Sequence, residues 1–163
     1  MSGARTDADR VQDANTAYYE AMERGDFDAL TALWLSDDRP AVSCVHPGWP
    51  VLSGRGEVLR SYALIMANTE YIQFFLTDVE VDVAGDTAVV TCTENILSGG
   101  PAPDEGEELG PLVGQLVVAT NVFLRTPEGW RLWSHHSSPV LAESDDQGGS
   151  GDPPGGDPDG SPA

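Results

Sequence analysis

The chain has 163 residues, with 27 acidic residues against eight arginines and no lysine, and its formal net charge is −19. A surface this acidic repels phosphate backbones and anionic lipids, so the composition argues against nucleic acid or a membrane as a partner. The chain has no run of about 18 apolar residues that could span a membrane. Its polar N-terminus also lacks the apolar stretch of a secretory signal, and we therefore expect a cytoplasmic protein.

The first part of the chain predicts three helices. A capping box formed by Thr6 and Asp9 begins the first helix, in which apolar residues recur at helical spacing over residues 6–24. A short helix is expected over residues 27–34, and a third over residues 55–67. The third helix is apolar over so much of its girth that we expect it to be mostly covered.

Residues 41–53, AVSCVHPGWPVLS, separate the second helix from the third. The segment begins as a short apolar strand and ends in a loop that carries His46 and Trp49. After the third helix the period of the apolar pattern changes to two, which is typical of strands. We expect four further strands, over residues 71–84, 87–97, 113–125 and 130–138.

The alternation within these strands predicts which side chains face the core. In the first of the four, Phe75 shares a face with Val79, Val81 and Val83, opposite three acids. Gly85-Asp86 is typical of a two-residue hairpin turn into the next strand. The more apolar side of that strand carries Glu94 inward. The strand over residues 113–125 is apolar on both sides, which predicts that both of its faces are covered.

The pattern of helices followed by strands predicts one α+β domain over residues 1–141, with the helices on one face of a single sheet. A loop rich in glycine, proline and acid is expected at residues 98–111. Residues 142–163 contain almost no apolar side chain and predict a disordered acidic tail. Cys44 and Cys92 lie in apolar strand segments and are expected to be buried free thiols.

Three segments carry a resemblance to a known family: AMERGDFDALTALW, CVHPGWPVLSGRGEVLRSY and NVFLRTPEGWRLWSHHSSPV. They resemble the nuclear transport factor 2-like superfamily, in its SnoaL-like, ketosteroid-isomerase-like branch. The resemblance implies a cystatin-like α+β barrel, in which a cone-shaped, curved antiparallel sheet packs three helices on its concave face. It also implies a homodimer formed through the sheet and a pocket between helices and sheet. The base and oxyanion residues of ketosteroid isomerase have no residue-by-residue match here.

Three residues are candidates for catalysis in that pocket. An inward carboxylate at Glu94 should have a raised pKa unless it is paired with Arg60, Asn121 or a histidine, in which case its role would be structural. The unperturbed pKa of a histidine is close to neutral pH, so His46 could act as an acid or base, or could order its own loop. His135 and His136 point to opposite faces of a strand, and the pattern slightly favours His136 for the pocket.

Further residues are candidates for substrate binding. They are aromatic side chains that could line an apolar pocket or be plain core, together with two polar residues at its edge: Tyr18, Trp34, Trp49, Tyr62, Arg60 and Asn121. No ligand spacing supports a metal site, and no phosphate or dinucleotide motif is present, so we expect no cofactor.

Two functions remain open from the sequence. The first is a small-molecule site inside the cone, whose chemistry would be cofactor-free proton transfer on a hydrophobic substrate, in an isomerase, cyclase or hydratase. The second is a non-catalytic module that forms a homodimer or binds a protein through its sheet. An open interior that Glu94 faces favours the first, and a filled interior favours the second.

Overall fold

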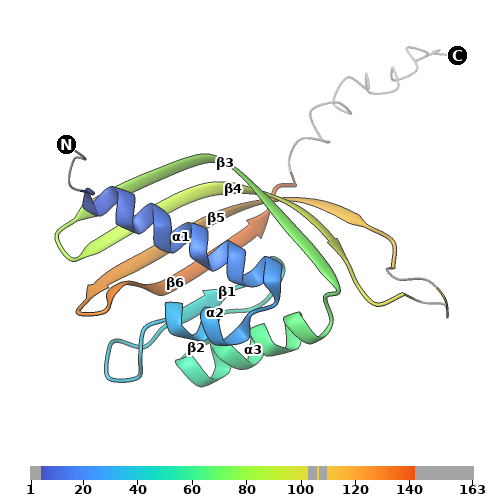
Figure 1. Cartoon of the computed structure of the whole chain (residues 1–163), viewed down its shortest axis with the longest axis horizontal. Helices are drawn as coiled ribbons and strands as arrows, with labels where there is room; N and C mark the ends of the chain where they lie inside the picture. The colour runs from blue at the N-terminus through green and yellow to red at the C-terminus, as the bar shows by residue number, and fades with distance from the viewer. Residues whose placement is uncertain (1–4, 103–105, 107–109, 142–163) are drawn as a thin grey trace, which may run out of the picture.

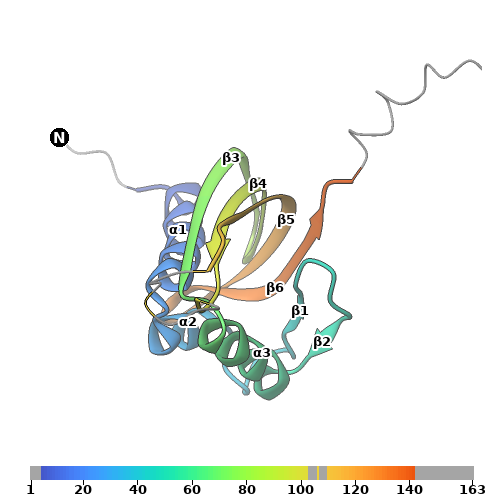
Figure 2. The same ribbon diagram turned by 90° about the vertical axis from the view of Figure 1, so that its right-hand side faces the viewer.

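The computed structural model of the chain describes residues 5–102, 106 and 110–141. Within this part of the chain, three helices pack on one face of a curved six-stranded sheet, as predicted (Figures 1 and 2). The expected acidic tail over residues 142–163 lies outside the described residues. None of the described helices is long and apolar enough to cross a membrane.

The helices begin and end where local chemistry dictates. The Thr6 side chain accepts from the Asp9 amide and the Asp9 carboxylate accepts from the Thr6 amide, which confirms the predicted capping box. Gly25 ends the first helix with a φ of 62°, in the left-handed region that glycine adopts without strain. The Asp26 side chain then caps the second helix. The helices are α1 (Asp7–Arg24), α2 (Phe27–Leu33) and α3 (Arg55–Ala67).

The strands lie in the order β2-β1-β6-β5-β4-β3. Neighbours are antiparallel except for β1, which runs parallel to β6. The hairpin at Gly85-Asp86 is confirmed, whereas the two-residue strand β2, which closes the loop after β1, was not predicted. The strands are β1 (Ser43–Val45), β2 (Leu52–Ser53), β3 (Tyr71–Ala84), β4 (Thr87–Gly99), β5 (Val113–Thr126) and β6 (Gly129–Pro139).

An irregularity in β3 reverses the side to which its residues point. The pairing with β4 shifts between Thr77 and Glu80, and Asp78 has a φ of 53° there. Phe74 therefore packs on the core together with Val79, while Phe75 is 54% exposed on the other side of the sheet. The prediction that Phe75 shares a face with Val79 is wrong, because a bulge resets the alternation.

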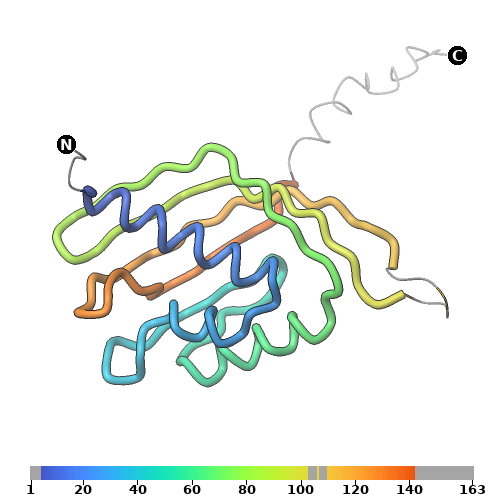
Figure 3. Tube along the Cα trace, viewed as in Figure 1, coloured from blue at the N-terminus to red at the C-terminus, as the bar shows by residue number. Residues whose placement is uncertain are grey.

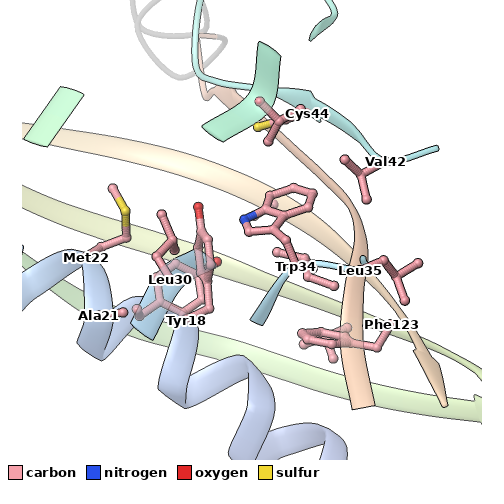
Figure 4. Close-up of a cluster of buried hydrophobic side chains, with 14 of the residues drawn as sticks. Tyr18, Ala21, Met22, Leu30, Trp34, Leu35, Val42, Cys44 and Phe123 are labelled. Atoms are coloured by element: carbon pink, nitrogen blue, oxygen red, sulfur yellow. The ribbon is translucent and has the colours of Figure 1, made fainter. Parts of the chain in front are cut away.

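The core fills the space between α1, α2 and the sheet (Figure 4). Trp34 and Leu35 follow α2 and run beside β6, where the Leu35 amide donates to the Leu132 carbonyl. The chain trace in Figure 3 shows α1 lying across the strands of the sheet. The third helix covers less than predicted: it buries Val58, Ser61 and Tyr62, but Leu64 is 57% exposed. The expectation of a mostly covered α3 is wrong because only one of its sides faces the body of the protein.

Candidate functional site

A cluster of polar side chains lies inside the cone. It includes six of the nine candidates from the sequence, each at most 5% exposed: Tyr18, Trp34, His46, Tyr62, Glu94 and Asn121. Three candidates lie elsewhere: Trp49, Arg60 and His136. Helices α1 and α3 and strands β1, β4, β5 and β6 contribute to the cluster, so the curvature of the sheet brings distant segments to one place.

Glu94 projects inward from β4 and is 3% exposed, as the alternation predicted. The Tyr19 hydroxyl donates to Glu94 Oε2 over 2.5 Å. Burial raises the pKa of Glu94 to about 7, although the Tyr19 hydrogen bond partly offsets this. Arg60, Asn121 and a histidine were the partners expected from the sequence, but the hydrogen-bond partner is a tyrosine on α1. At neutral pH the carboxyl group is therefore poised between its two forms.

Asn121 joins the two halves of the cluster. Its amide nitrogen donates to Asn15 Oδ1 over 2.8 Å and to the Tyr19 hydroxyl over 3.2 Å. Its oxygen lies 2.5 Å from His135 Nδ1. Because that oxygen is only an acceptor, His135 carries its proton on Nδ1 and keeps a free lone pair on Nε2. A continuous line of hydrogen bonds thus runs from His135 through Asn121 and Tyr19 to Glu94.

The histidine inside the cone is His135, and the expectation that favoured His136 is wrong. His135 is 3% exposed, whereas His136 is exposed on the opposite face of the sheet. The cause is a second irregularity: β5 residues Val122 and Phe123 pair with Ser134 and Leu132, which leaves Trp133 without a partner in this pairing. That extra residue reverses the alternation of β6, so the side chains after it point to the opposite face from the one that counting predicts.

Two further pairs complete the cluster. The hydroxyl oxygens of Tyr18 and Tyr62 lie 2.7 Å apart, and burial raises the pKa of both well above the ordinary value, so both remain neutral donors. His46 Nε2 lies 2.8 Å from Ser61 Oγ. Ser61 donates its own proton to the Val58 carbonyl, so His46 must donate Nε2–H to Ser61. The serine proton is therefore not available to His46, which argues against a serine nucleophile.

Both buried histidines are neutral. Burial lowers the pKa of His46 to about 4. It lowers that of His135 to about 3, with His46 and His136 adding smaller effects of the same sign. The buried thiol of Cys44 lies 3.5 Å from the Tyr62 hydroxyl, and burial raises its pKa to about 12. The cluster therefore contains neutral donors and acceptors, with Glu94 as the group that changes charge near pH 7.

One donor of the cluster has no partner among the described residues. It is the indole nitrogen of Trp34, which is buried without a hydrogen bond to that part of the chain. In Figure 4 this nitrogen points toward Tyr18, and the Trp34 ring lies 5.8 Å from that of Tyr62. A buried N–H without an acceptor is rare and destabilising, and an oxygen of a bound molecule would satisfy it.

Trp49 and Arg60 do not reach the interior. Trp49 is 37% exposed, and its ring contacts the His46 ring at 5.0 Å, which places it over the outer side of that histidine. Arg60 is exposed on α3, so the expectation that it lies at the cavity edge is wrong: it points away from the side that carries Tyr62. Among the described residues, no group of three His, Cys, Asp or Glu side chains is placed to hold a metal ion.

Tyr19, Asn15 and Ser61 were not predicted from the sequence, and of His135 and His136 the wrong one was favoured. Asn15 had a usable signal, because it lies four residues after Val11 on the apolar stripe of α1, where a polar residue needs a buried partner. Tyr19 is four residues further on and donates to Glu94. Ser61 had no comparable signal, since a serine inside a helix commonly bonds to its own backbone.

The interior is closed around the cluster, and a small hollow lies one helical turn away. It has a volume of about 110 Å³ and lies between the ends of α1 and α3 and the start of β3. Met22, which lines it, follows Tyr18 by four residues, and Met66 follows Tyr62 by four. Methionine side chains are flexible, so this seam next to the two tyrosines can rearrange more easily than a seam of branched side chains.

A curved sheet around helices, with a buried carboxyl group and neutral polar donors inside, defines the chain as a protein of the nuclear transport factor 2-like fold. The chain belongs to the SnoaL-like domain family, whose model matches residues 11–143. A search of curated protein sequences finds no match.

Solved structures agree with this assignment. A Streptomyces avermitilis protein of the NTF2-like family, provisionally named a dehydratase, is 76% identical over 83% of this chain and 97% of its own, with a TM-score of 0.79. A Thiobacillus denitrificans protein, provisionally named a calcium/calmodulin-dependent kinase II association domain, is 26% identical over 80% and 94%, with a TM-score of 0.63. A ketosteroid isomerase-like protein from Erwinia carotovora, 18% identical over 85% and 99%, shares the fold with a TM-score of 0.67.

Proposed function

We propose that the chain is a cofactor-free enzyme that removes water from, or adds it to, a small hydrophobic substrate next to a carbonyl group. The observation that carries this proposal is Glu94: a buried carboxyl group whose pKa is about 7, held by Tyr19 among neutral donors. A general acid or base works best when its pKa lies near the working pH. The name of the Streptomyces avermitilis relative, a provisional dehydratase at 76% identity, points to the same reaction class.

The chemistry assigns one step to each part of the cluster. The Glu94 carboxylate takes the proton from the carbon next to the carbonyl group, and negative charge develops on the carbonyl oxygen. The Tyr18 and Tyr62 hydroxyls are hydrogen-bonded to each other, so the one whose proton is not used in that bond donates to the carbonyl oxygen, together with the indole N–H of Trp34. The hydroxyl group on the next carbon then leaves with the proton that Glu94 holds. A carbon–carbon double bond forms, water departs, and Glu94 returns to its ionised form.

His135 has a separate role in this proposal. Its Nε2 lone pair is free because Asn121 holds the proton on Nδ1, so it can accept a hydrogen bond from the substrate hydroxyl. Asn121 is a positioning residue, since it sets this tautomer and donates to Tyr19. The substrate reaches the cluster through the seam at Met22 and Met66, whose side chains must move to admit it.

The test is a screen of small aromatic and aliphatic β-hydroxy carbonyl compounds by thermal shift, followed by an absorbance assay for the conjugated product. We expect at least one compound to stabilise the protein and to be dehydrated. Glu94→Gln should bind it but lose roughly 10²-fold or more in kcat. His136→Gln changes a histidine on the far face of the sheet and should keep the wild-type rate. If no compound stabilises either wild type or Glu94→Gln, the proposal fails.

A second candidate is a non-catalytic homodimer formed through the sheet. Two observations favour it: the interior is filled by its own side chains, and the far face of the sheet carries exposed apolar residues, among them Leu116 at 42% and Val118 at 44%. The sequence predicted that both faces of β5 are covered. In the single chain only one face is covered, and a second subunit would cover the other. Sedimentation of wild type and Val118→Glu tests it: a dimer that the substitution dissociates supports the candidate, and a monomeric wild type removes it.

A further inference from the structure

A second hollow, apart from the polar cluster, lies at the outer end of the molecule. It has a volume of about 420 Å³ and is enclosed by the end of α2, the connection from α2 to β1, the start of α3 and the turn between β5 and β6. Arg39, Arg55 and Arg131 line it, together with the acids Asp38 and Glu128. Three of the eight arginines of a chain with a net charge of −19 therefore meet at one place.

These three arginines differ from the others in their partners. Within the described residues, carboxylates pair with Arg5, Arg10, Arg24 and Arg125 and with no other arginine. Arg60, the fourth without a carboxylate partner in that part of the chain, is exposed on α3 outside the hollow. Within the part of the chain that the structure describes, three of the four arginines without a carboxylate partner therefore line this hollow.

The two acids of the hollow lie close to hydroxyl groups. The Asp38 carboxylate accepts a hydrogen bond from the Ser36 hydroxyl, and this bond, with a smaller contribution from the charge of Arg39, holds the pKa of Asp38 below its usual value. The Glu128 carboxylate lies 3.3 Å from the Thr126 hydroxyl, whose proton is donated to the Gly129 carbonyl over 2.7 Å. Although both line the hollow, neither forms an ion pair with Arg39, Arg55 or Arg131. Guanidinium groups near one another repel, and an oxyanion between them would remove that repulsion.

Arg55 forms the fixed wall of the hollow. Its guanidinium donates to the carbonyl oxygens of Thr31, Trp34 and Leu35 over 2.8–3.0 Å, which satisfies groups at the end of α2 and holds the side chain rigidly. The half-buried Arg39 and Arg131 lie beside it, and the Arg131 guanidinium also donates to the Trp130 carbonyl. A guanidinium fork offers several donors in one plane, so each retains donors for a ligand.

We propose that this hollow binds the oxyanion group of a small molecule, a phosphate or a carboxylate, through Arg39 and Arg131 against the wall formed by Arg55. Its volume exceeds that of a bare phosphate, so a phosphorylated or carboxylated organic molecule is the class of ligand that it fits. The site is separate from the one proposed at Glu94, although Trp34 lies between the two, and its test does not depend on that reaction. The strong net negative charge of the rest of the protein repels anions, so any saturable binding reports a specific site.

The experiment is a titration of the full chain with inorganic phosphate, and separately with malonate, followed by backbone amide NMR at constant ionic strength. We expect saturable shifts around residues 36–39 and 126–131 with at least one of the two anions. Arg39→Gln and Arg131→Gln should each weaken binding by roughly tenfold or more, as expected for the loss of a charge-assisted hydrogen bond. Arg60→Gln removes the same charge outside the hollow and should leave the affinity unchanged.

Each outcome decides the proposal. Saturation by phosphate alone identifies a phosphate site, and saturation by malonate alone identifies a carboxylate site. If neither anion gives saturable shifts, or if Arg60→Gln weakens binding as much as Arg131→Gln does, the hollow is no anion site. Arg55 is left unchanged throughout, because its loss would release the end of α2. Thermal unfolding of each variant confirms that the chain still folds.

Discussion

The substitution Glu94→Gln tests the electrostatics of the interior directly. Glutamine keeps the shape of the side chain and an oxygen that can accept from the Tyr19 hydroxyl, but it cannot ionise. The folded protein holds the proton of Glu94 more tightly than the unfolded chain does, because burial raises the pKa from 4.5 to about 7. The wild type therefore loses stability as pH rises from 4.5 through 7, and the variant does not share that loss.

The magnitude follows from the two pKa values. A difference of one pKa unit corresponds to about 1.4 kcal/mol, so the ionised carboxylate destabilises the fold by roughly 3 kcal/mol above pH 7. Relative to wild type, we expect the pH-dependent gain in stability of Glu94→Gln to be about 1 kcal/mol at pH 5 and roughly 3 kcal/mol at pH 8. Comparing the two proteins at each pH cancels the contributions of the histidines, which are present in both.

The assay is urea unfolding followed by tryptophan fluorescence at intervals between pH 5 and pH 8.5. Glu80→Gln, at an exposed position of β3, is the control, and its stability should differ from that of wild type by less than about 0.5 kcal/mol. If the stability difference between Glu94→Gln and wild type is the same at every pH, Glu94 does not sit in a water-excluding interior. The acid/base role proposed for it would then lose its basis.

Three further predictions follow from the same structure. Tyr19→Phe removes the hydrogen bond that lowers the pKa of Glu94, so the Glu94 carboxyl should titrate at higher pH in a side-chain NMR titration; an unchanged or lower pKa contradicts the contact. His135 is buried in its neutral form with a pKa of about 3, so the unfolded chain binds a proton there that the folded protein does not, and the wild type should lose stability as pH falls below 6.5. In urea unfolding, His135→Gln should lose less stability than wild type between pH 6.5 and pH 5. Asp78→Val places a β-branched residue at a φ of 53° and should destabilise the protein by roughly 1–2 kcal/mol, whereas Asp78→Gly should be tolerated; equal stability of the two variants would argue against the bulge.

Much of the fold could be predicted because its signals are local. The capping box at Thr6, the glycine after α1 and the hairpin at Gly85-Asp86 depend on residues a few positions apart. Each acts through its own hydrogen bonds or backbone angles, so sequence is sufficient to find it. The inward side of β4 was also predictable, because its alternation is unbroken over the residues that carry Cys92 and Glu94.

The partners inside the cone could not be predicted in the same way. His135 replaced His136 because one unpaired residue in β6 reversed the alternation, and Phe75 turned outward for the same reason in β3. A bulge changes the side of every later residue but leaves almost no trace in composition. The contact of Tyr19 with Glu94 joins residues 75 positions apart, and only the curvature of the sheet determines it.

The polar cluster weakens the fold that contains it. A carboxyl group with a raised pKa, two histidines kept neutral by burial and an indole N–H without an acceptor all carry desolvation penalties. Apolar side chains of the same volume would fill the space at lower free energy, since replacing buried polar groups by well-packed hydrophobic residues is often stabilising. Stability alone therefore does not account for these residues. The proton transfer proposed at Glu94 would account for them, because it requires a titratable group that water does not solvate and fixed donors around the atom on which charge develops.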